Sequence, residues 1–416
     1  MVIEYPRRVD AEPVRLAHDV RPRETRTLDI AMIGTRGVPA SYGGFETAVE
    51  EIGRRLVERG HGVTVYTRGS QTRDRTYLGM KVVHLPALPV KQLETLSHTG
   101  LSAVHAVLGR RPDAAFVFNA ANSPFLPALR ARGIPTALHM DGLEWKRSKW
   151  GRRGKAYYRW AEEFGVRTAD ALVADAPGIS EYYDREFGVP TELIRYGAPL
   201  LEHAPVDGVH ALGLAPGGYH LVVARFEPEN HVLEIVEGYR ASAALRPLVV
   251  VGSAPYAAEY TERIRAAAGD DPRIRFLGGV YDQDLLDALY FHALTYVHGH
   301  SVGGTNPSLL RAMGAGTAVV AYDVGFNHET LDEHGLFFAH AADATRHFTA
   351  LENDLPLAGA LGARGKMRAA SDFRWDDVAT AYENLAARLA VGESIHGQAR
   401  AAHRGAGGRT AVSAAR

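Results

Sequence analysis

The sequence predicts an α/β protein with two Rossmann-like domains, each built on a doubly wound parallel sheet. Short apolar segments alternate with amphipathic helical segments along most of the chain. A Gly/Pro/Ala-rich passage at 197–218 interrupts this alternation once, as a linker between domains would. The length of 416 residues is enough for two domains with separate cores. In such sheets ligands lie at the carboxyl ends of the strands, so functional residues are expected in the loops that follow strands.

The first half of the chain begins with a βαβ unit. An apolar strand over 28–33 is followed by a helix over 45–59, whose apolar residues lie on one stripe and which Gly60 ends. A second strand is expected at 63–67. Further strands of this half are expected at 114–119, 136–139 and 171–174.

The alternation resumes after the linker and ends in a last amphipathic helix over 376–389, next to Trp375. Strands are expected at 220–224, 248–251, 274–277, 294–297 and 318–322. Residues 1–27 mix arginines with acids and prolines and are expected to form a flexible arm. Residues 393–416 are rich in Ala, Gly and Arg and are expected to form a disordered tail, because they have too few large apolar side chains to fold alone.

The composition excludes several classes of protein. Hydrophobic residues make up 46% and charged residues 23%, as in a soluble globular protein, and the net charge of −1 gives no field that favours nucleic acid. Cysteine is absent, which excludes disulfides and thiolate metal sites and fits a reducing compartment such as the cytoplasm. No apolar run approaches the roughly 20 residues that span a bilayer, and no secretory signal is expected at the N-terminus.

Two glycine-containing loops carry the strongest functional signal. Residues 34–46, Gly-Thr-Arg-Gly-Val-Pro-Ala-Ser-Tyr-Gly-Gly-Phe-Glu, follow a strand and open a helix, so the amides of Gly43 and Gly44 can face a phosphate; a plain βα turn is the alternative. Residues 298–316 combine a glycine loop with a short helix, for which Thr305 or Asn306 is the expected cap and Pro307 the first residue. Free amides and the helix dipole together predict an anion site here.

Three other loops follow predicted strands and carry polar side chains. His139, Asp141 and Glu144 cluster after one strand, which favours a functional role over the alternative of a buried core histidine. Arg225 follows the first strand of the second half and suits bidentate pairing with phosphate. Asp282 precedes a helix and is better interpreted as its cap than as a metal ligand.

These motifs, above all residues 34–46, 139–150 and 298–316, resemble those of retaining glycosyltransferases of family 4, and residues 34–46 resemble the rhamnosyltransferase-like branch. The resemblance covers roughly residues 28–392 and implies the GT-B architecture, in which the two Rossmann-like domains face each other across a cleft. It implies an acceptor-side domain over 28–200, a donor domain over 201–372 and a helix over 373–392 that crosses back onto the first domain. The implied reaction moves a sugar, rhamnose in that branch, from a nucleotide-diphosphate donor to a glycan or polyprenyl-linked acceptor with retention. No metal or other cofactor is implied.

The resemblance also assigns roles to residues. It makes His139 and Arg225 catalytic, with His139 beside the transferred sugar, and it places Tyr42, Asp141 and Glu144 on the acceptor side. The donor would be bound by Gly43, Gly44, Arg225, His231, Gly278, His300, Gly303, Gly304, Thr305, Asn306, Arg311 and Glu329.

Two departures from the family pattern affect the donor site. Relatives carry glutamates at the positions of Gly303 and Arg311; the rhamnosyltransferase-like branch has glycine at the first, but arginine at the second reverses a charge. A guanidinium only donates hydrogen bonds, so Arg311 cannot accept them from ribose hydroxyls, although it can donate to phosphate. The lysine that relatives place after the Arg225 position is missing around His231. We therefore hypothesise that nucleoside binding is weakened or rearranged and that transfer is slowed.

Basic and aromatic residues alternate over 145–160, which holds three of the four tryptophans. Such a segment suits the headgroups of an anionic membrane, which would make the protein peripheral at the cytoplasmic face, or a diphosphate-linked lipid acceptor. The alternative is a solvated helix whose aromatics pack inward. A second function also stays open: a catalytically weak, glycosyltransferase-like protein that binds a glycan, a lipid or a partner enzyme.

Overall fold

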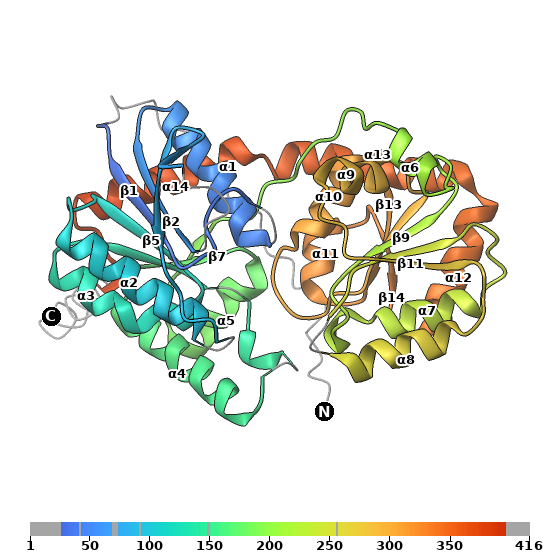
Figure 1. Ribbon diagram of the computed structural model, residues 1–416, viewed down its shortest axis with the longest axis horizontal. Coiled ribbons are helices and arrows are strands. Elements are labelled where there is room, and N and C mark those ends of the chain that lie inside the picture. Colours follow the sequence, from blue (N-terminus) through green and yellow to red (C-terminus); the bar gives the residue numbers. More distant parts are fainter. Residues whose placement is uncertain are drawn as a thin grey trace, which may run out of the picture.

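The computed structural model describes residues 26–40, 43–68, 74–90, 93–140, 142–147, 150–254 and 257–396. These residues form two α/β domains that lie side by side, each with its own sheet (Figure 1). The predicted fold class is therefore confirmed. Tyr42, Asp141 and most of the two predicted flexible ends lie outside the described residues.

The sheet of the first domain has the order β3-β4-β2-β1-β5-β6-β7-β8 and is parallel except for β3, which pairs antiparallel with β4. Its strands are β1 Asp29–Ile33, β2 Gly62–Arg68, β3 Thr76–Tyr77, β4 Met80–Leu85, β5 Ala114–Phe118, β6 Thr136–His139, β7 Ala171–Ala174 and β8 Glu192–Leu193. Its helices are α1 Gly44–Glu58, α2 Glu94–Leu108, α3 Leu126–Ala131, α4 Arg152–Thr168 and α5 Pro177–Phe187, with short 3-10 turns η1 Ala120–Phe125 and η2 Glu144–Lys146.

The sheet of the second domain is entirely parallel, in the order β11-β10-β9-β12-β13-β14. Its strands are β9 His220–Val223, β10 Leu248–Val251, β11 Ile274–Gly278, β12 Thr295–His298, β13 Ala318–Tyr322 and β14 Leu336–Phe338. Its helices are α6 Asp207–Ala211, α7 Val232–Arg240, α8 Ala258–Ala268, α9 Gln283–Phe291, α10 Pro307–Ala315, α11 Gly325–Leu331, α12 Ala341–Asn353 and α13 Leu355–Asp372, with the 3-10 turn η3 Pro228–Asn230.

The strand order of each sheet reverses once, between β1 and β5 in the first domain and between β9 and β12 in the second. Loops on the two sides of such a reversal diverge at the carboxyl ends of the strands and leave a crevice. The crevices are therefore lined by the loops after β1 and β5 in one domain and after β9 and β12 in the other. Both predicted glycine loops start at these points, after β1 and β12.

Successive side chains of each strand point to opposite faces of the sheet. Both faces are apolar because helices cover both of them. In β5, Phe116 and Phe118 belong to the core on one face, whereas Ala115 and Val117 belong to the core on the other. The first of these layers also receives α14 (Trp375–Ala390), which runs from the second domain back over the first (Figure 1). The end of the chain is thereby attached to the domain in which it began.

The structure corrects two expectations about irregular segments. The linker over 197–218 contains the short helix α6, whose Val209 is buried in the core beside Leu289. The predicted disordered tail begins at 393, yet residues 393–396 pack on the first domain: the amide of Ile395 donates to the carbonyl of Asp170 at 2.8 Å and the Ile395 side chain is buried. The buried side chain of Ile395 holds this turn against the first domain.

Candidate active site

The glycine loop after β12 ends in a capped helix. The Asn306 side chain accepts from the amide of Ser308 at 3.0 Å and from its hydroxyl at 2.7 Å, and Pro307 is the first residue of α10. Of the two predicted caps, Asn306 is therefore the correct one. Thr305 instead donates its hydroxyl to the carbonyl of Asp175 in the first domain at 2.7 Å.

The N-terminus of α1 meets the N-terminus of α10 across the cleft. An ideal Cβ at Gly44, the first residue of α1, would lie 2.8 Å from Cγ of Pro307, so only glycine allows this approach. Gly43 caps α1 at a φ of 117°, without a side-chain hydrogen bond. Since the N-terminal amides of a helix carry partial positive charge, the positive ends of two helix dipoles, one from each domain, come together here.

His139 ends β6 within a ring of aromatic side chains. Its imidazole lies 5.1 Å from the ring of Phe45, 5.6 Å from Phe118 and 6.1 Å from Tyr196, measured between centroids. Burial lowers the pKa of His139 to about 3, so the ring is neutral at physiological pH. Its Nδ1 is buried without a hydrogen-bond partner among the described residues. A neutral imidazole in this state can donate or accept one hydrogen bond but carries no charge.

The loop that follows His139 contacts the glycine loop of the second domain. An ideal Cβ at Gly142 would lie 2.6 Å from Cα of Gly303. In the same loop Glu144 is buried, forms an ion pair with Arg147 and accepts from the indole nitrogen of Trp150 at 3.1 Å. The Glu144 carboxylate thus fixes its own loop in this structure.

Positive charge gathers around His300, on the opposite side of the cleft. His300 stacks on His298, with centroids 4.4 Å apart; His298 is buried and His300 is half-buried. Burial lowers the pKa of His300 well below its usual value, and nearby His298, Arg225 and Arg147 lower it further. Arg225 and Arg147 belong to different domains, so an anion bound near His300 would meet cations from both. Sequence reasoning did not assign Arg147 to the site; its place in the basic segment after His139 was the only signal.

Arg225 and His231 lie in the loop after β9. The guanidinium of Arg225 is 3.7 Å from the carboxylate of Glu227 and is about one-third exposed. His231 has a left-handed φ of 47°, stacks on Tyr322 at 3.8 Å and shares a hydrogen bond with the Ser301 hydroxyl at 3.0 Å. Arg225, the predicted phosphate-binding cation, and His231, around which the family's lysine is missing, therefore lie at the same strand end.

Arg311 points to a protein carboxylate. It forms an ion pair with Asp287 of α9, which also accepts from Nε2 of Gln283 at 3.2 Å. The reversed charge at this position is thus balanced within the domain. Gly278, at the end of β11, has a φ of 71° and open space where a Cβ would stand.

Glu329 crosses to the first domain. Its Oε2 accepts from the amide of Gly178, in the first turn of α5, at 3.4 Å. Burial raises the pKa of Glu329, and the nearby carboxylate of Glu181 adds to the rise, while the Gly178 amide and Arg195 oppose it. Nothing in the sequence pattern of either residue pointed to this contact.

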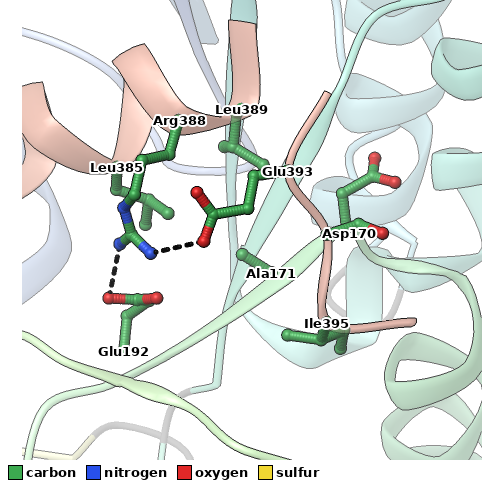
Figure 2. Close-up of a pocket in the computed structure, with 9 residues that line it drawn as sticks. Asp170, Ala171, Glu192, Leu385, Arg388, Leu389, Glu393 and Ile395 are labelled. Atoms are coloured by element: carbon green, nitrogen blue, oxygen red, sulfur yellow. Dashed lines mark hydrogen bonds and ion pairs between the residues drawn. The ribbon is translucent and has the colours of Figure 1, made fainter. Parts of the chain in front are cut away.

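A shallow pocket lies elsewhere, at the amino-terminal end of β7 (Figure 2). Arg388 of α14 pairs there with Glu192 at 2.7 Å and with Glu393 at 3.2 Å. His139 and the glycine loops lie at the carboxyl edges of the sheets, so this pocket belongs to the attachment of α14 and not to the candidate site. Among the described residues, no group of three or more His, Asp or Glu side chains is arranged to hold a metal ion.

Comparisons with known proteins agree with this arrangement. Residues 43–199 match a family model described as "Glycosyl transferase 4-like domain", and residues 219–354 match one described as "Glycosyl transferases group 1". No curated protein sequence matches the chain. No helix among the described residues is both long and apolar enough to cross a membrane.

Solved structures share the whole fold. Sucrose-phosphate synthase from Thermosynechococcus elongatus has a TM-score of 0.74 and 23% identity, over 88% of this chain and 99% of its own. HepE from Anabaena, in complex with UDP-glucose, has a TM-score of 0.70 and 16% identity, over 86% and 99%. An α,α-trehalose-phosphate synthase from Burkholderia vietnamiensis has a TM-score of 0.62 and 14% identity, over 87% and 99%. The fold and the two domain matches together identify the chain as a two-domain glycosyltransferase with the GT-B fold.

Proposed function

We propose that the protein is a hexosyltransferase that moves a sugar from a nucleotide-diphosphate donor to a glycan or polyprenyl-linked acceptor, in polysaccharide or glycoconjugate biosynthesis. The proposal rests on the contact between two helix N-termini, at Gly44 of α1 and Pro307 of α10. The glycine loop before Pro307 also contacts the loop that follows His139. A diphosphate in that position would be held by amides of both domains. Arg225 would add a guanidinium suited to a phosphate oxygen.

The proposed mechanism is electrostatic. As the bond between sugar and diphosphate breaks, negative charge grows on the leaving group, and oriented amides with Arg225 stabilise it without reorganising. The neutral imidazole of His139 would form a hydrogen bond with a hydroxyl of the sugar, beside the reacting carbon. We propose retention by front-face attack, in which the leaving diphosphate takes the proton of the acceptor hydroxyl. No metal is needed, because amides and guanidinium supply the positive charge.

The acceptor is proposed to bind on the first domain, toward Tyr42, Asp141 and Glu144. The surface of α4 supports a lipid-linked acceptor at a membrane: Arg152 and Arg153 are exposed at its start, and Trp160 is about half exposed and stacks on Phe164. Such a mixture of cations and an exposed aromatic suits anionic headgroups. The same helix also buries part of its aromatic set, because the Tyr157 hydroxyl donates to the carbonyl of Ala121.

The nucleoside end of the donor site differs most from the family pattern. The pair formed by Arg311 and Asp287 supports a rearranged ribose contact, in which the carboxylate comes from α9 and not from α10. Replacing Arg311 with Glu would place two carboxylates side by side. We expect Arg311→Glu to change the affinity for nucleoside diphosphates about tenfold or more, measured by calorimetry beside the wild type. Equal binding and equal transfer by both proteins would make Arg311 harmless.

The test of the proposed function is a donor screen. The full chain is incubated with UDP-, GDP- and dTDP-sugars, including rhamnose on thymidine diphosphate, and release of the nucleoside diphosphate is followed. A thermal-shift screen with the free diphosphates runs in parallel, because a ligand that binds the folded state raises its apparent stability. The proposal requires turnover of at least one donor and loss of that turnover in His139→Ala.

The second candidate function is a catalytically weak binding protein of the same fold. It is supported by Arg311 and by the lysine that is missing around His231, both of which depart from the family pattern. This alternative predicts that nucleoside diphosphates or glycans bind without turnover of any donor. Absence of both turnover and nucleotide binding would contradict the enzyme.

A further inference from the structure

Several contacts between the two domains across the cleft occur at glycines. For four glycines, an ideal Cβ would lie within 3.2 Å of an atom of the opposite domain: Gly44 with Pro307, Gly142 with Gly303, Gly178 with Glu329 and Gly304 with Asp175. The closest is Gly304, whose Cβ would stand 2.0 Å from the Asp175 carboxylate. Side chains at these places would hold the domains apart, so these glycines define a closed arrangement of the two domains.

The N-cap residue of helix α5, in the first domain, provides no side-chain cap. This residue, Ala176, makes no side-chain hydrogen bond, and Pro177 at the first position has no N–H. The amide of Gly178 is therefore one of the donors that a helix start leaves unsatisfied. Glu329 of the second domain accepts from it at 3.4 Å, and its negative charge lies at the positive end of the helix dipole. Glu329 thus caps α5 from across the cleft.

A second bond holds the same turn from its other end. The Thr305 hydroxyl donates to the carbonyl of Asp175 at 2.7 Å, and both residues are buried. Asp175 follows β7, and Thr305 belongs to the glycine loop that leads into α10. The turn at 175–178 is therefore held by Thr305 at one end and by Glu329 at the other.

Glu329 is firmly placed within its own domain. Arg368 of α13 donates from Nη2 to the carbonyl of Glu329 at 3.0 Å and from Nε to the carbonyl of Thr330 at 2.8 Å. These bonds fix the end of α11, so the carboxylate reaches α5 from a rigid base. A cap held in this way can position one domain on the other.

We propose that Thr305 and Glu329 are positioning residues that latch the turn at 175–178 onto the glycine loop and so hold the cleft closed. Thr305 lies two residues before Pro307, at the candidate anion site, so closing the latch also sets the loop that would hold the diphosphate. The consequence for sugar transfer rests on the proposed function: closure would bring His139 to the sugar. The latch itself depends only on the contacts between the domains.

Distances between spin labels test the latch without any substrate. The chain contains no cysteine, so two introduced cysteines accept labels without removing native ones. Glu163 of α4 and Glu259 of α8 are exposed and lie on different domains. Glu163→Cys/Glu259→Cys provides the labelled background in which each further variant is compared.

Two substitutions test the latch from opposite sides. Glu329→Ala removes the cap, whereas Gly178→Ala places a methyl group 3.2 Å from Oε1 of Glu329, which must move by a few tenths of an ångström. Losing a cap typically shifts an equilibrium about fivefold. We expect Glu329→Ala to populate longer label distances than the wild type, Gly178→Ala to do so less, and the double variant Thr305→Val/Glu329→Ala to do so most. Glu329→Gln, which still accepts a hydrogen bond, should stay closer to the wild type than Glu329→Ala.

Gly359→Ala is the matched control. Gly359 also lies in a helix, but nothing stands within 4 Å of its Cβ position, so its label distances should equal those of the wild type. If all the variants, including the double variant, give the wild-type distances, the latch is wrong. If the distances change as expected while no donor is turned over, the latch stands and the proposed function fails. Where transfer is measurable, opening the latch should lower kcat and the affinity for the nucleoside diphosphate together, each by about fivefold, because Thr305 also sets the loop that would hold the diphosphate.

Discussion

The first domain contacts the rest of the chain along two interfaces of different character. We call the interface with α14 the α14 seam, and the interface with the second domain across the cleft the cleft seam. The α14 seam is apolar and charged: the Tyr382 ring packs on Phe116 with centroids 4.8 Å apart, Leu385 is buried, and Glu383 accepts from Arg59 at 2.7 Å and pairs with His61 at 2.8 Å. The cleft seam consists of glycine contacts and the two latch bonds made by Thr305 and Glu329. One seam buries large side chains, and the other is built to let backbones approach.

This difference assigns different tasks to the seams. Breaking the α14 seam would expose several large apolar side chains, which makes it a permanent attachment. Opening the cleft seam would cost only a few hydrogen bonds that water can replace. A two-domain enzyme that must admit a donor and exclude water during transfer needs one seam of each kind. Substitutions should therefore affect stability at the α14 seam and activity at the cleft seam.

The largest effect is expected from Tyr382→Ala. It removes a fully buried ring and leaves a cavity against Phe116, which should lower the free energy of unfolding by about 3–5 kcal/mol. Urea unfolding followed by circular dichroism measures this loss. Tyr382→Phe keeps the ring and should lose less than about 1.5 kcal/mol. A loss below 1 kcal/mol in Tyr382→Ala would show that the α14 seam does not hold the first domain.

Gly304→Ala is expected to lower the activity and to leave the stability nearly unchanged. The added methyl would meet the Asp175 carboxylate, so the glycine loop must shift away from the first domain. A displacement near 1 Å at a reacting site can reduce the rate about 100-fold. We expect kcat/KM to fall by roughly this factor, while the free energy of unfolding changes by less than about 1 kcal/mol. A variant that loses stability but keeps its activity would reverse the roles of the seams.

The α14 seam should also weaken in acid. Burial alone would raise the pKa of Glu383, but hydrogen bonds from His61 and Arg59 hold it below its ordinary value of 4.5. A carboxylate with a lowered pKa stabilises the fold above the pKa of the unfolded chain, and this stabilisation is lost as the pH falls below about 4.5. Glu383→Gln should make the unfolding free energy flatter between pH 4.5 and 3. An unchanged slope in titrations of both proteins would exclude this pair as an acid-sensitive element.

The smallest effect is expected from Gly359→Ala, which touches neither seam. The substitution lies in α13 and meets open space, so it should raise the free energy of unfolding by about 0.5–1 kcal/mol through helix propensity alone. Thermal unfolding measures the gain, and kcat should not change. A change in activity would mean that stability alone influences the cleft.

The fold could be predicted from local patterns because buried parallel strands are short apolar runs between turn signals. The strands β6, β7, β10 and β13 have the expected bounds, and Asp282 caps α9 as expected. The two-residue strands β3 and β8 were not predicted, since two residues have no measurable period. The five-residue helix α6 was missed for the same reason, within a passage rich in Gly and Pro.

The candidate site was only partly predictable. The glycine loops and His139 come from motifs within single loops, whereas the important pairings join distant residues. Glu329 and Gly178 are 151 positions apart, and Arg311 and Asp287 are 24 apart. No periodicity connects such pairs. The first follows from how the two domains are placed against each other, and the second from how α9 and α10 pack within one domain. The resemblance supplied the location of Glu329 near the cleft but not its partner.

The central claim is that two helix N-termini, one from each domain, hold a diphosphate between them. Calorimetric titration of the wild-type chain with UDP and UMP, and with dTDP and dTMP, tests this claim directly. The account predicts that the diphosphate of the base that fits binds at least tenfold more tightly than the monophosphate, about 1.4 kcal/mol. It also predicts that Gly44→Ala, whose methyl group would push the two helix ends apart, removes most of this difference. Equal affinity for monophosphate and diphosphate, unchanged by Gly44→Ala, would contradict it.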